Sequence, residues 1–401
     1  MNTSFLQQSC DGNKSASLKK ELIRLFVVNG NFSITDLSKE VNISAPTITK
    51  LIGELITEGF VIDFGKQGTS GGRRPNMYGL NPEAGYFVGV DIKKDSLSLG
   101  LITFKGQLIE HEDKTFILEN TMQSLDKLCS LIKSYVSKLS IPKEKILAVG
   151  VNISGRVNSE SGYSYSFYYL DEKPLSMLIE ERIDCSVFIE NDSRSMTYGE
   201  YMLGENNSPK NMLFINASWG LGIGIIIDGK LYYGKSGFSG EYGHFPFFDN
   251  EIICRCGKRG CLETGASGSA VHRIFMESLK EGRVSMLSNK YGRGEPISLE
   301  DIMDAVLKED VLAIEIMESV GNELGKAISG LINLFNPELI VIGGTLSSAK
   351  DYILLPIKSA INKYSLILVS KDTKVKISKL GDKCGIMGAC MLARSKTLGL
   401  L

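Results

Sequence analysis

The sequence lacks long apolar runs, and its charges almost cancel. No stretch approaches the roughly 18–20 apolar residues that a membrane-spanning helix needs, and the polar start Met1-Asn-Thr-Ser is unlike a secretory signal. The formal net charge of −1 argues against a globally basic nucleic-acid binder. Hydrophobic content of 43% and charged content of 23% are typical of soluble globular proteins. The composition therefore predicts a cytoplasmic protein, and 401 residues predict two or three domains.

The eight cysteines do not form the pattern of a disulfide framework. Five are scattered along the chain: Cys10, Cys129, Cys185, Cys384 and Cys390. The other three lie close to one of only three histidines in the chain. This group is His244, Cys254, Cys256 and Cys261. Reduced thiols in an intracellular compartment fit this distribution better than disulfides do.

The spacing within residues 244–261 is typical of a zinc-binding loop. Zinc takes four nitrogen or sulfur ligands in tetrahedral geometry, so the backbone must fold tightly around it. Gly257 and Gly260 lie between the last ligands and can supply the bends. Carboxylates flank the loop at Glu241 and Glu263. The pattern predicts a structural zinc ion that holds a rigid recognition loop.

The first eighty residues predict a small DNA-binding domain. Residues 1–16 are polar and are expected to form a disordered tail. Three helices follow, over residues 18–28, 34–41 and 44–58, with Ser17 and Ser33 as N-caps of the first two. Residues 60–64 and 76–80 are typical of a β-hairpin around a glycine-rich tip. Three helices and a hairpin predict a winged helix-turn-helix over residues 17–81.

The third helix divides into an apolar and a polar face. Its apolar residues recur at i, i+3, i+4 and i+7 and should face the core: Ile48, Leu51, Ile52 and Leu55. The opposite face suits entry into the major groove of DNA, although it could also be a plain solvated face. The predicted DNA contacts on this face are Pro46, Thr47, Thr49 and Lys50. Arg73 and Arg74 at the hairpin tip could reach phosphates or a minor groove.

The rest of the chain repeats one pattern of strands and helices. Residues 87–92, 96–103 and 106–110 predict an antiparallel meander, followed by a helix near 121–139 and a buried strand at 146–153. The second half begins similarly, with strands at 212–217 and 220–227 and the turn signal Asp228-Gly229. We therefore expect a duplicated α/β domain with a cleft between its lobes. The predicted boundaries are a linker at 82–86, a first lobe at 87–200 to which a C-terminal helix (384–398) returns, and a second lobe at 201–383.

Five segments together resemble the ROK family of repressors, open reading frames and sugar kinases. They are Glu190-Asn-Asp, Gly220-Leu-Gly-Ile-Gly, Gly240-Glu-Tyr-Gly-His, Cys254-Arg-Cys-Gly-Lys-Arg-Gly-Cys-Leu-Glu and Asn336-Pro-Glu-Leu-Ile-Val-Ile-Gly-Gly. The resemblance implies an α/β, two-lobed, actin-like ATPase fold, which is sugar-kinase-like and built from duplicated ribonuclease H-like halves. It also implies a cytoplasmic homodimer or homotetramer. Members with an N-terminal winged helix, such as regulators of xylose and N-acetylglucosamine use, are repressors released by a sugar or sugar phosphate.

The same resemblance implies a set of sugar-binding residues. They are Asn191, Asp192, Glu241, His244 and Glu263. Carboxylates and amides form paired hydrogen bonds with vicinal hydroxyls, so this set suits a hexose. Asp192 also matches the catalytic base of the family's kinases. Nearby segments depart from the family pattern at 153–157 and, with several aromatics, at 163–170, so we expect a reshaped pocket and an inducer other than glucose or N-acetylglucosamine.

The phosphate-binding elements depart further from the kinase pattern. Family kinases carry Asp-x-Gly-Gly-Thr after the first strand, whereas this chain has Asp91-Ile-Lys-Lys-Asp. Side chains would crowd this turn, and Asp95 would repel phosphate. The second loop, Ala217-Ser-Trp-Gly-Leu-Gly, is also altered, while Gly343-Gly344-Thr survives. We therefore expect no catalytic residue, Asp192 being a vestigial base, and no enzyme activity.

These observations predict a sugar-responsive repressor with operator DNA and a sugar or sugar phosphate as its partners. In this hypothesis, sugar binding closes the lobes and moves the winged helices of a dimer relative to the operator half-sites. Two alternatives remain open at this point. One is an active, ATP-dependent sugar kinase of the hexokinase or glucokinase type with an accessory DNA-binding domain. The other is a scaffold with neither sugar nor operator.

Overall fold

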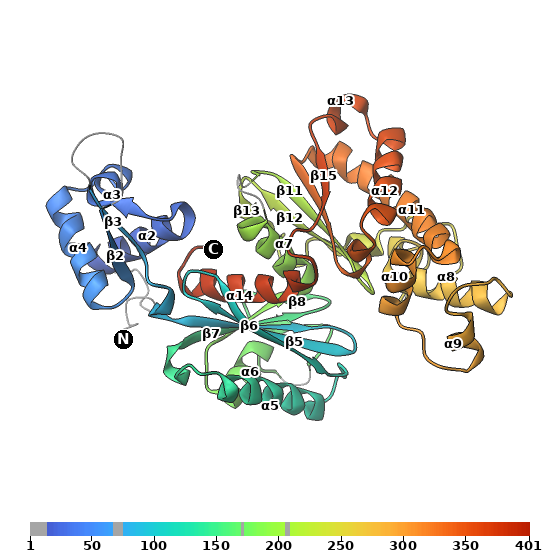
Figure 1. Ribbon diagram of the computed structural model, residues 1–401, viewed down its shortest axis with the longest axis horizontal. Helices are drawn as coiled ribbons and strands as arrows, with labels where there is room; N and C mark the ends of the chain where they lie inside the picture. Colours follow the sequence, from blue (N-terminus) through green and yellow to red (C-terminus); the bar gives the residue numbers. More distant parts are fainter. Residues whose placement is uncertain (1–13, 67–74, 170–171, 205–208) are drawn as a thin grey trace. The chain divides into compact units, whose positions relative to one another are not determined.

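The computed structural model describes residues 14–66, 75–169, 172–204 and 209–401, and its chain forms two compact units (Figure 1). Unit 1 contains the chain through Asn152 together with Phe167–Ile189 and Ala389–Leu401. Unit 2 contains Ile153–Ser166 and Glu190–Gly388. None of the helices in the described part of the chain has the length and apolarity that a membrane-crossing segment needs.

Unit 1 begins with three helices and a small sheet. The helices are α2 (Lys14–Asn29), α3 (Ile34–Glu40) and α4 (Ala45–Thr57). The strands are β1 (Phe32–Ser33), β2 (Val61–Lys66) and β3 (Asn76–Leu80), in the antiparallel order β1-β3-β2. Ser33 caps α3 as predicted, since its side chain accepts a hydrogen bond from the Asp36 amide. The four predicted core residues of α4 are all buried, so the helical period determined this face correctly.

The first helix starts earlier than the sequence predicted. It begins at Lys14, so residues 14–16 of the predicted tail are helical, while residues 1–13 lie outside the described part. Ala16 is buried in the helical core. Lys19, also buried, forms ion pairs with Glu54 of α4 and with Glu58 just after it, at 2.8 and 2.7 Å. The burial of Ala16 stabilises the first turn and the ion pairs of Lys19 stabilise the next one, and local sequence signals reveal neither contact.

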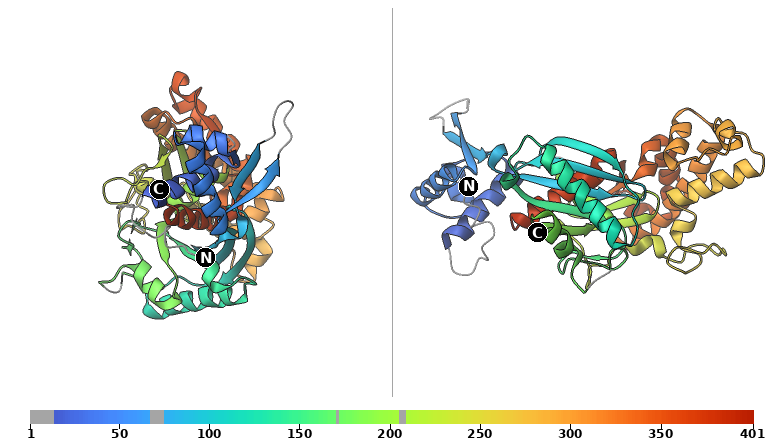
Figure 2. Two further views of the ribbon diagram at one scale, coloured as in Figure 1. Left: turned by 90° about the vertical axis from the view of Figure 1, so that its left-hand side faces the viewer. Right: turned by 90° about the horizontal axis from the view of Figure 1, so that it is seen from below.

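The first large sheet has five strands in the order β10-β7-β4-β5-β6. They are β4 (Tyr86–Ile92), β5 (Ser96–Thr103), β6 (Leu108–Thr115), β7 (Ile146–Ile153) and β10 (Val187–Asn191). Helices α5 (Met122–Lys138) and α6 (Leu175–Ile183) cover one face, and the C-terminal part of α14 (Cys384–Thr397) covers the other (Figures 1 and 2). The predicted meander, its following helix and the buried strand are all present.

Unit 2 contains a second five-stranded sheet in the order β13-β12-β11-β14-β15. The strands are β11 (Met212–Ala217), β12 (Leu221–Ile227), β13 (Lys230–Leu231), β14 (Leu339–Gly343) and β15 (Lys374–Ile377). As in the first sheet, an antiparallel meander is joined by a later strand parallel to its first strand. The structure therefore repeats one topology, as the sequence predicted.

Helices pack on the second sheet and build the larger core. Helix α7 (Asp192–Leu203) packs against β11 and β12. The apolar core combines β11, β12 and β14 with four helices. These are α8 (Gly268–Lys280), α10 (Leu299–Leu307), α11 (Val311–Phe335) and α12 (Asp351–Tyr364). The short helices α9 (Ser288–Gly292) and α13 (Ile367–Ser370) and the hairpin β8 (Val157–Asn158) and β9 (Tyr163–Ser164) complete the unit.

Helix α7 belongs to unit 2, although the sequence boundary assigned residues 190–200 to the first lobe. The reason is close packing against β12, whose glycines leave no room for side chains. A Cβ atom at Gly222 would lie 2.3 Å from Ser193 Oγ, and one at Gly224 would lie 1.8 Å from Thr197 Oγ1. The residues at the start of α7 therefore share a unit with the cysteine-rich loop.

Candidate functional site

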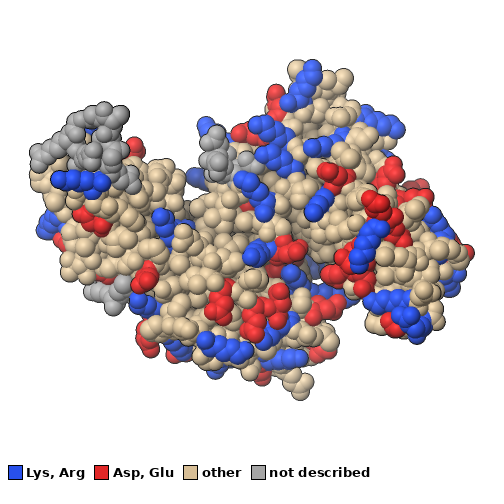
Figure 3. Space-filling view, in the orientation of Figure 1, with Lys and Arg blue, Asp and Glu red and all other residues tan. Residues whose placement is uncertain are grey.

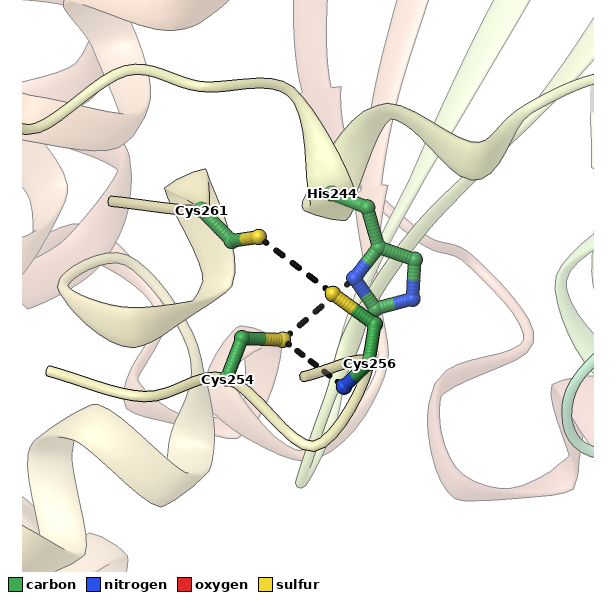
Figure 4. A group of neighbouring side chains, drawn as sticks. All are labelled: His244, Cys254, Cys256 and Cys261. Atoms are coloured by element: carbon green, nitrogen blue, oxygen red, sulfur yellow. Dashed lines mark hydrogen bonds between the residues drawn. The ribbon is translucent and has the colours of Figure 1, made fainter. Parts of the chain in front are cut away.

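The histidine and three cysteines of the predicted metal loop point toward one another (Figure 4). Their ligand atoms all lie within 4.8 Å of one another. His244 Nδ1 is 3.5 Å from Cys254 Sγ, and the sulfurs of Cys256 and Cys261 are 3.6 Å apart. Three sulfurs and one nitrogen at these separations could hold a metal ion.

Tight backbone turns bring these side chains together. His244 ends the 3-10 turn Glu241–His244, and Cys261 precedes the 3-10 turn Leu262–Thr264. The amides of Phe247 and Phe248 both bond to the Gly260 carbonyl, at 2.8 and 2.9 Å. Gly260 has φ of +70°, and a Cβ atom there would lie 2.1 Å from Phe248 O. Only glycine fits this position, which explains its place before Cys261.

Two carboxylates flank the cluster. His244 directs Nδ1 toward Cys254, while its Nε2 lies 3.8 Å from Glu241 Oε2. A ligating histidine commonly directs its second nitrogen to a carboxylate in this way, which fixes the ring. Glu263 is 5% exposed, its Oε1 lies 2.9 Å from Cys254 Sγ, and its Oε2 has no hydrogen-bond partner among the described residues. This buried oxygen could accept a hydrogen bond from a bound hydroxyl group.

Asn191 and Asp192 form a second polar group at the junction of β10 and α7. Asn191 caps α7 by accepting from the Arg194 amide at 3.1 Å, and its Nδ2 donates to the Gly155 carbonyl at 2.9 Å. The Asp192 carboxylate accepts from the Ser193 amide at 2.7 Å and from Asn191 Nδ2 at 3.1 Å. Both side chains are thus held in fixed positions by their own turn.

Strand β12 connects the two groups. On one side, Gly222 of β12 contacts Ser193, the residue after Asp192. On the other, a Cβ atom at Gly240 would lie 2.0 Å from Ile223 O, and the Ile223 amide donates to Gly240 O at 3.1 Å. Gly240 directly precedes Glu241. The five predicted sugar-binding residues therefore lie in unit 2, in two groups attached to the same strand.

The sequence did not predict the buried ion pair that lies next to Asn191. Arg194 and Glu190 are 1% and 2% exposed, and Arg194 Nη2 lies 2.8 Å from Glu190 Oε1. Arg194 also donates to the Val157 carbonyl at 2.8 Å, and Glu190 Oε1 accepts from the Asn191 amide at 2.8 Å. The pair therefore positions the turn that carries Asn191. Its four-residue spacing was visible in the sequence, but its burial was not.

The turn at residues 93–95, which the sequence predicted to be an altered phosphate loop, is closed by backbone hydrogen bonds. Lys93 N bonds to Ser96 O at 2.9 Å, and the carbonyls of Lys94 and Asp95 accept from Leu118 and Phe116. Asp91 is 1% exposed, and burial raises its pKa above the usual range. Burial disfavours the charged form of this carboxyl, while the nearby Lys93 and the Asn152 side chain favour it.

The loop at residues 217–222 also forms hydrogen bonds and packing contacts within the protein. The first two amides of α8 donate to Ser218 O at 2.8 Å and Trp219 O at 2.9 Å, so they are not free for an anion. Ser218 Oγ donates a hydrogen bond to Asn216 at 2.6 Å. The same hydroxyl occupies the space that a Cβ atom on Gly344 would need, so only glycine fits there. Trp219 packs on His272 with ring centroids 5.4 Å apart.

The predicted DNA-contacting residues of α4 are exposed. Pro46, Thr47, Thr49 and Lys50 all reach solvent, whereas Arg73 and Arg74 lie outside the described residues. Thr49 Oγ1 bonds to the Ala45 carbonyl at 2.8 Å within the helix. On the face shown in Figure 3, Lys and Arg are interspersed with Asp and Glu.

Comparisons with known proteins place this geometry in a family. The ROK family model matches residues 87–396. A xylose repressor of Caldicellulosiruptor bescii is 30% identical over 390 residues, which cover 95% of this chain and 98% of that protein. A glucokinase of Halalkalibacterium halodurans is also 30% identical, over 78% of this chain and 96% of its own length.

A solved structure resembles the chain over nearly its whole length. It is a ROK family transcriptional regulator described as a homolog of the E. coli MLC protein, with 27% identity and a TM-score of 0.78. The match covers 95% of each chain. The mixed α/β fold of residues 87–396 is thus the sugar-kinase-like, actin-like fold that the sequence predicted.

Proposed function

Because the chain belongs to the ROK family, we propose that it is a transcriptional repressor that binds a sugar or sugar phosphate and then releases its operator DNA. One observation carries this proposal. The xylose repressor and the solved regulator cover 95% of the chain, whereas the glucokinase covers 78%. The difference corresponds to the N-terminal helices and small sheet that precede residue 87, the start of the family match. We assign this segment as a winged helix-turn-helix.

The phosphate-binding elements support a regulator without kinase activity. The amides of Lys93 and of the first two residues of α8 already donate hydrogen bonds within the protein. Phosphoryl transfer needs such donors and a metal ion at the phosphates. The sugar-binding residues, in contrast, remain grouped around β12. We propose that Asn191, Asp192, Glu241, His244 and Glu263 bind the sugar and that Asp192 no longer acts as a base.

The metal cluster supports a structural zinc ion. Three cysteines and one histidine are a common donor set for structural zinc, whose four ligands leave no open position. Zinc bound by His244, Cys254, Cys256 and Cys261 would anchor the loop that carries Glu241 and Glu263. The side chains of Glu241 and Glu263, and not the zinc ion, would then bind and orient the hydroxyl groups of the sugar.

Helix α14 offers a route from the sugar site toward DNA. Its first residues belong to unit 2, where a Cβ atom at Gly388 would lie 2.3 Å from Ser195 O of α7. Helix α7 carries Asn191 as its N-cap and Asp192 as its first residue. A shift of α7 on sugar binding would therefore be transmitted to α14.

The same helix ends in unit 1. There Arg394, which is buried, donates from Nε to the Phe104 carbonyl at 2.8 Å. The Phe104 ring lies 5.6 Å from that of Phe60, between α4 and β2. We propose that this continuous helix couples the sugar site to the DNA-binding segment. A coupling free energy of about 1–3 kcal/mol changes affinity by roughly 5–150-fold, enough for derepression.

A DNA-binding titration tests the proposal. Operator duplexes are selected from a random-sequence library, and the dissociation constant is measured at fixed salt with and without sugars that raise thermal stability. We expect a sugar to weaken binding by roughly 5–150-fold, and Asp192→Asn to retain DNA binding but lose the sugar response. Equal affinity with and without a stabilising sugar would rule out derepression.

A coupled ATPase assay with hexoses tests the kinase alternative, for which the similarity to a glucokinase is the reason. Turnover that depends on Asp192 would establish that alternative.

A second prediction concerns the exposed face of α4. Replacing Lys50 by alanine is expected to weaken operator binding and to reduce the slope of log affinity against log salt by about 0.9, because one phosphate contact is lost. Lys358→Ala on α12 removes the same charge from an exposed position outside the DNA-binding segment and should change neither quantity. If the two variants bind DNA alike, the assignment of Lys50 is wrong.

A further inference from the structure

Three aromatic side chains meet on unit 2 beside the proposed sugar site. The rings of Tyr163 and Tyr165 stack with centroids 6.1 Å apart, and Phe238 meets Tyr165 edge-on at 5.6 Å with an interplanar angle of 88°. Tyr165 and Phe238 are 43% and 37% exposed. We call these three residues the aromatic corner. Two perpendicular rings with exposed surface form a rigid apolar angle.

The aromatic corner is attached to the group that contains Asn191. The Tyr165 amide donates to Arg156 O at 2.8 Å, and the neighbouring carbonyl of Gly155 accepts from Asn191 Nδ2 at 2.9 Å. The Arg156 amide in turn donates to Ser166 Oγ at 3.0 Å. One short segment thus contacts both the tyrosine and the sugar-binding asparagine.

The corner is also attached to the loop that carries Glu241. Asn158 of β8 donates to Ser236 O at 3.4 Å, and a Cβ atom at Gly237 would lie 3.2 Å from Val157 O. Phe238 follows Gly237 directly and stands three residues before Glu241. Contacts through the main chain therefore join the aromatic corner to both segments that supply the proposed sugar-binding side chains.

The chemistry of this corner fits a carbohydrate ring. Binding sites combine apolar and aromatic walls with a few well-placed polar groups. The carboxylates and amide of the five-residue set supply polar groups for one ring. The corner supplies apolar faces, on which the C–H face of a second ring could stack, and its rings are already held in place before binding.

From this arrangement we propose that the effector is a carbohydrate of at least two rings, with its second ring stacked on Tyr165 and Phe238. This inference rests on the proposed function, because the first ring occupies the sugar site described above. Tyr165 and Phe238 are then specificity-determining residues that distinguish a disaccharide from its monosaccharide. Two exposed rings, on segments that contact the Asn191 turn or precede Glu241, point to this class of ligand.

Calorimetry with matched probes tests this inference. Glucose, xylose and N-acetylglucosamine are each compared with the β-1,4-linked disaccharide of the same unit, and maltose is added. One disaccharide is expected to bind at least about tenfold more tightly than its monosaccharide. Tyr165→Ala and Phe238→Ala should each weaken that disaccharide by about 3–10-fold, the strength of an aromatic contact, and leave monosaccharide affinity within about twofold. Tyr364→Ala on α12 is the matched control, because Tyr364 is 45% exposed and lies outside the corner.

Two results would overturn the inference: a monosaccharide or its phosphate that binds as tightly as every disaccharide, or a Tyr165→Ala variant that weakens both classes equally. The proposed function fails separately. If a disaccharide binds through the corner but does not release operator DNA, the ligand class holds and the repressor mechanism is wrong. If no carbohydrate binds, both are wrong.

Discussion

Replacing Arg194 by methionine should lower the free energy of unfolding of unit 2 by about 3–5 kcal/mol, because it leaves the buried Glu190 carboxylate without its charge partner. Both side chains are at most 2% exposed, so water cannot replace the lost contacts. The Arg194 guanidinium also lies 5.7 Å from the centre of the Tyr233 ring, and burial raises the pKa of that tyrosine. Tyr233 therefore stays neutral and adds no second negative charge beside Glu190.

The same substitution should abolish sugar binding, since Glu190 accepts from the Asn191 amide. Urea unfolding followed by tryptophan fluorescence measures the stability change. Trp219 is the only tryptophan of the chain and packs against the core of unit 2, so its signal reports on this unit. Calorimetry with the stabilising sugar measures the second effect.

Two further variants define the cause. Arg283→Met removes an ion pair with Glu315 in which both side chains are about half exposed, and it should change stability by at most about 1 kcal/mol. Combining Arg194→Met with Glu190→Gln should recover part of the lost stability, because no buried charge remains unpaired. An Arg194→Met protein as stable as Arg283→Met would show that the buried pair does not hold the turn.

Replacing Cys256 by serine is expected to release the metal ion. Serine keeps the size of the side chain but removes one of the four ligands, and Cys256 is exposed, so the substitution leaves the packed core unchanged. In zinc-finger peptides a structural zinc ion contributes about 10–16 kcal/mol. If about 3 kcal/mol of that is lost here, the melting temperature falls by roughly 6–12 °C. Metal analysis and thermal unfolding followed by Trp219 measure both changes.

Loss of the metal ion should also remove sugar binding, because Glu241 and Glu263 lie on either side of the metal loop. Cys185→Ser is the matched control, since Cys185 is half-buried, lies outside the cluster and should keep a full metal content. A Cys256→Ser protein that retains one metal ion per chain would contradict the four-ligand assignment.

Local patterns in the sequence predicted much of the fold. The period of Ile48, Leu51 and Ile52 correctly identified the buried face of α4. The first two strands of each meander appear where apolar runs placed them, whereas β6 runs over Leu108–Thr115 and not over the predicted residues 106–110, because pairing with β5 extends it through a polar segment. The metal cluster was predictable because its four residues lie within eighteen positions, where turns and glycines control the geometry. The turn Asp228-Gly229 has positive φ at both residues, as its sequence indicated.

The remaining features depend on contacts between distant segments. The burial of Arg194 depends on Val157, 37 positions earlier, and the ion pairs of Lys19 near the start of α2 depend on Glu54 and Glu58. The aromatic corner joins Tyr165 to Phe238 across more than seventy positions. No local period or turn signal reveals such pairs, since their free energy comes from packing that exists only in the folded chain.

The sequence by itself thus determined most of the secondary structure, the duplicated α/β architecture, the four residues that could hold a metal ion and the family, because each rests on residues close together or on ordered motifs. The tertiary structure decided which groups lie next to the proposed sugar site. It placed α7 with the predicted metal loop, buried the Glu190–Arg194 pair next to Asn191, and exposed two aromatic rings on segments that contact the Asn191 turn or precede Glu241. Burial determines how strongly charged groups interact, and contacts between distant segments determine which side chains a ligand can reach. Both arise only when distant segments pack together.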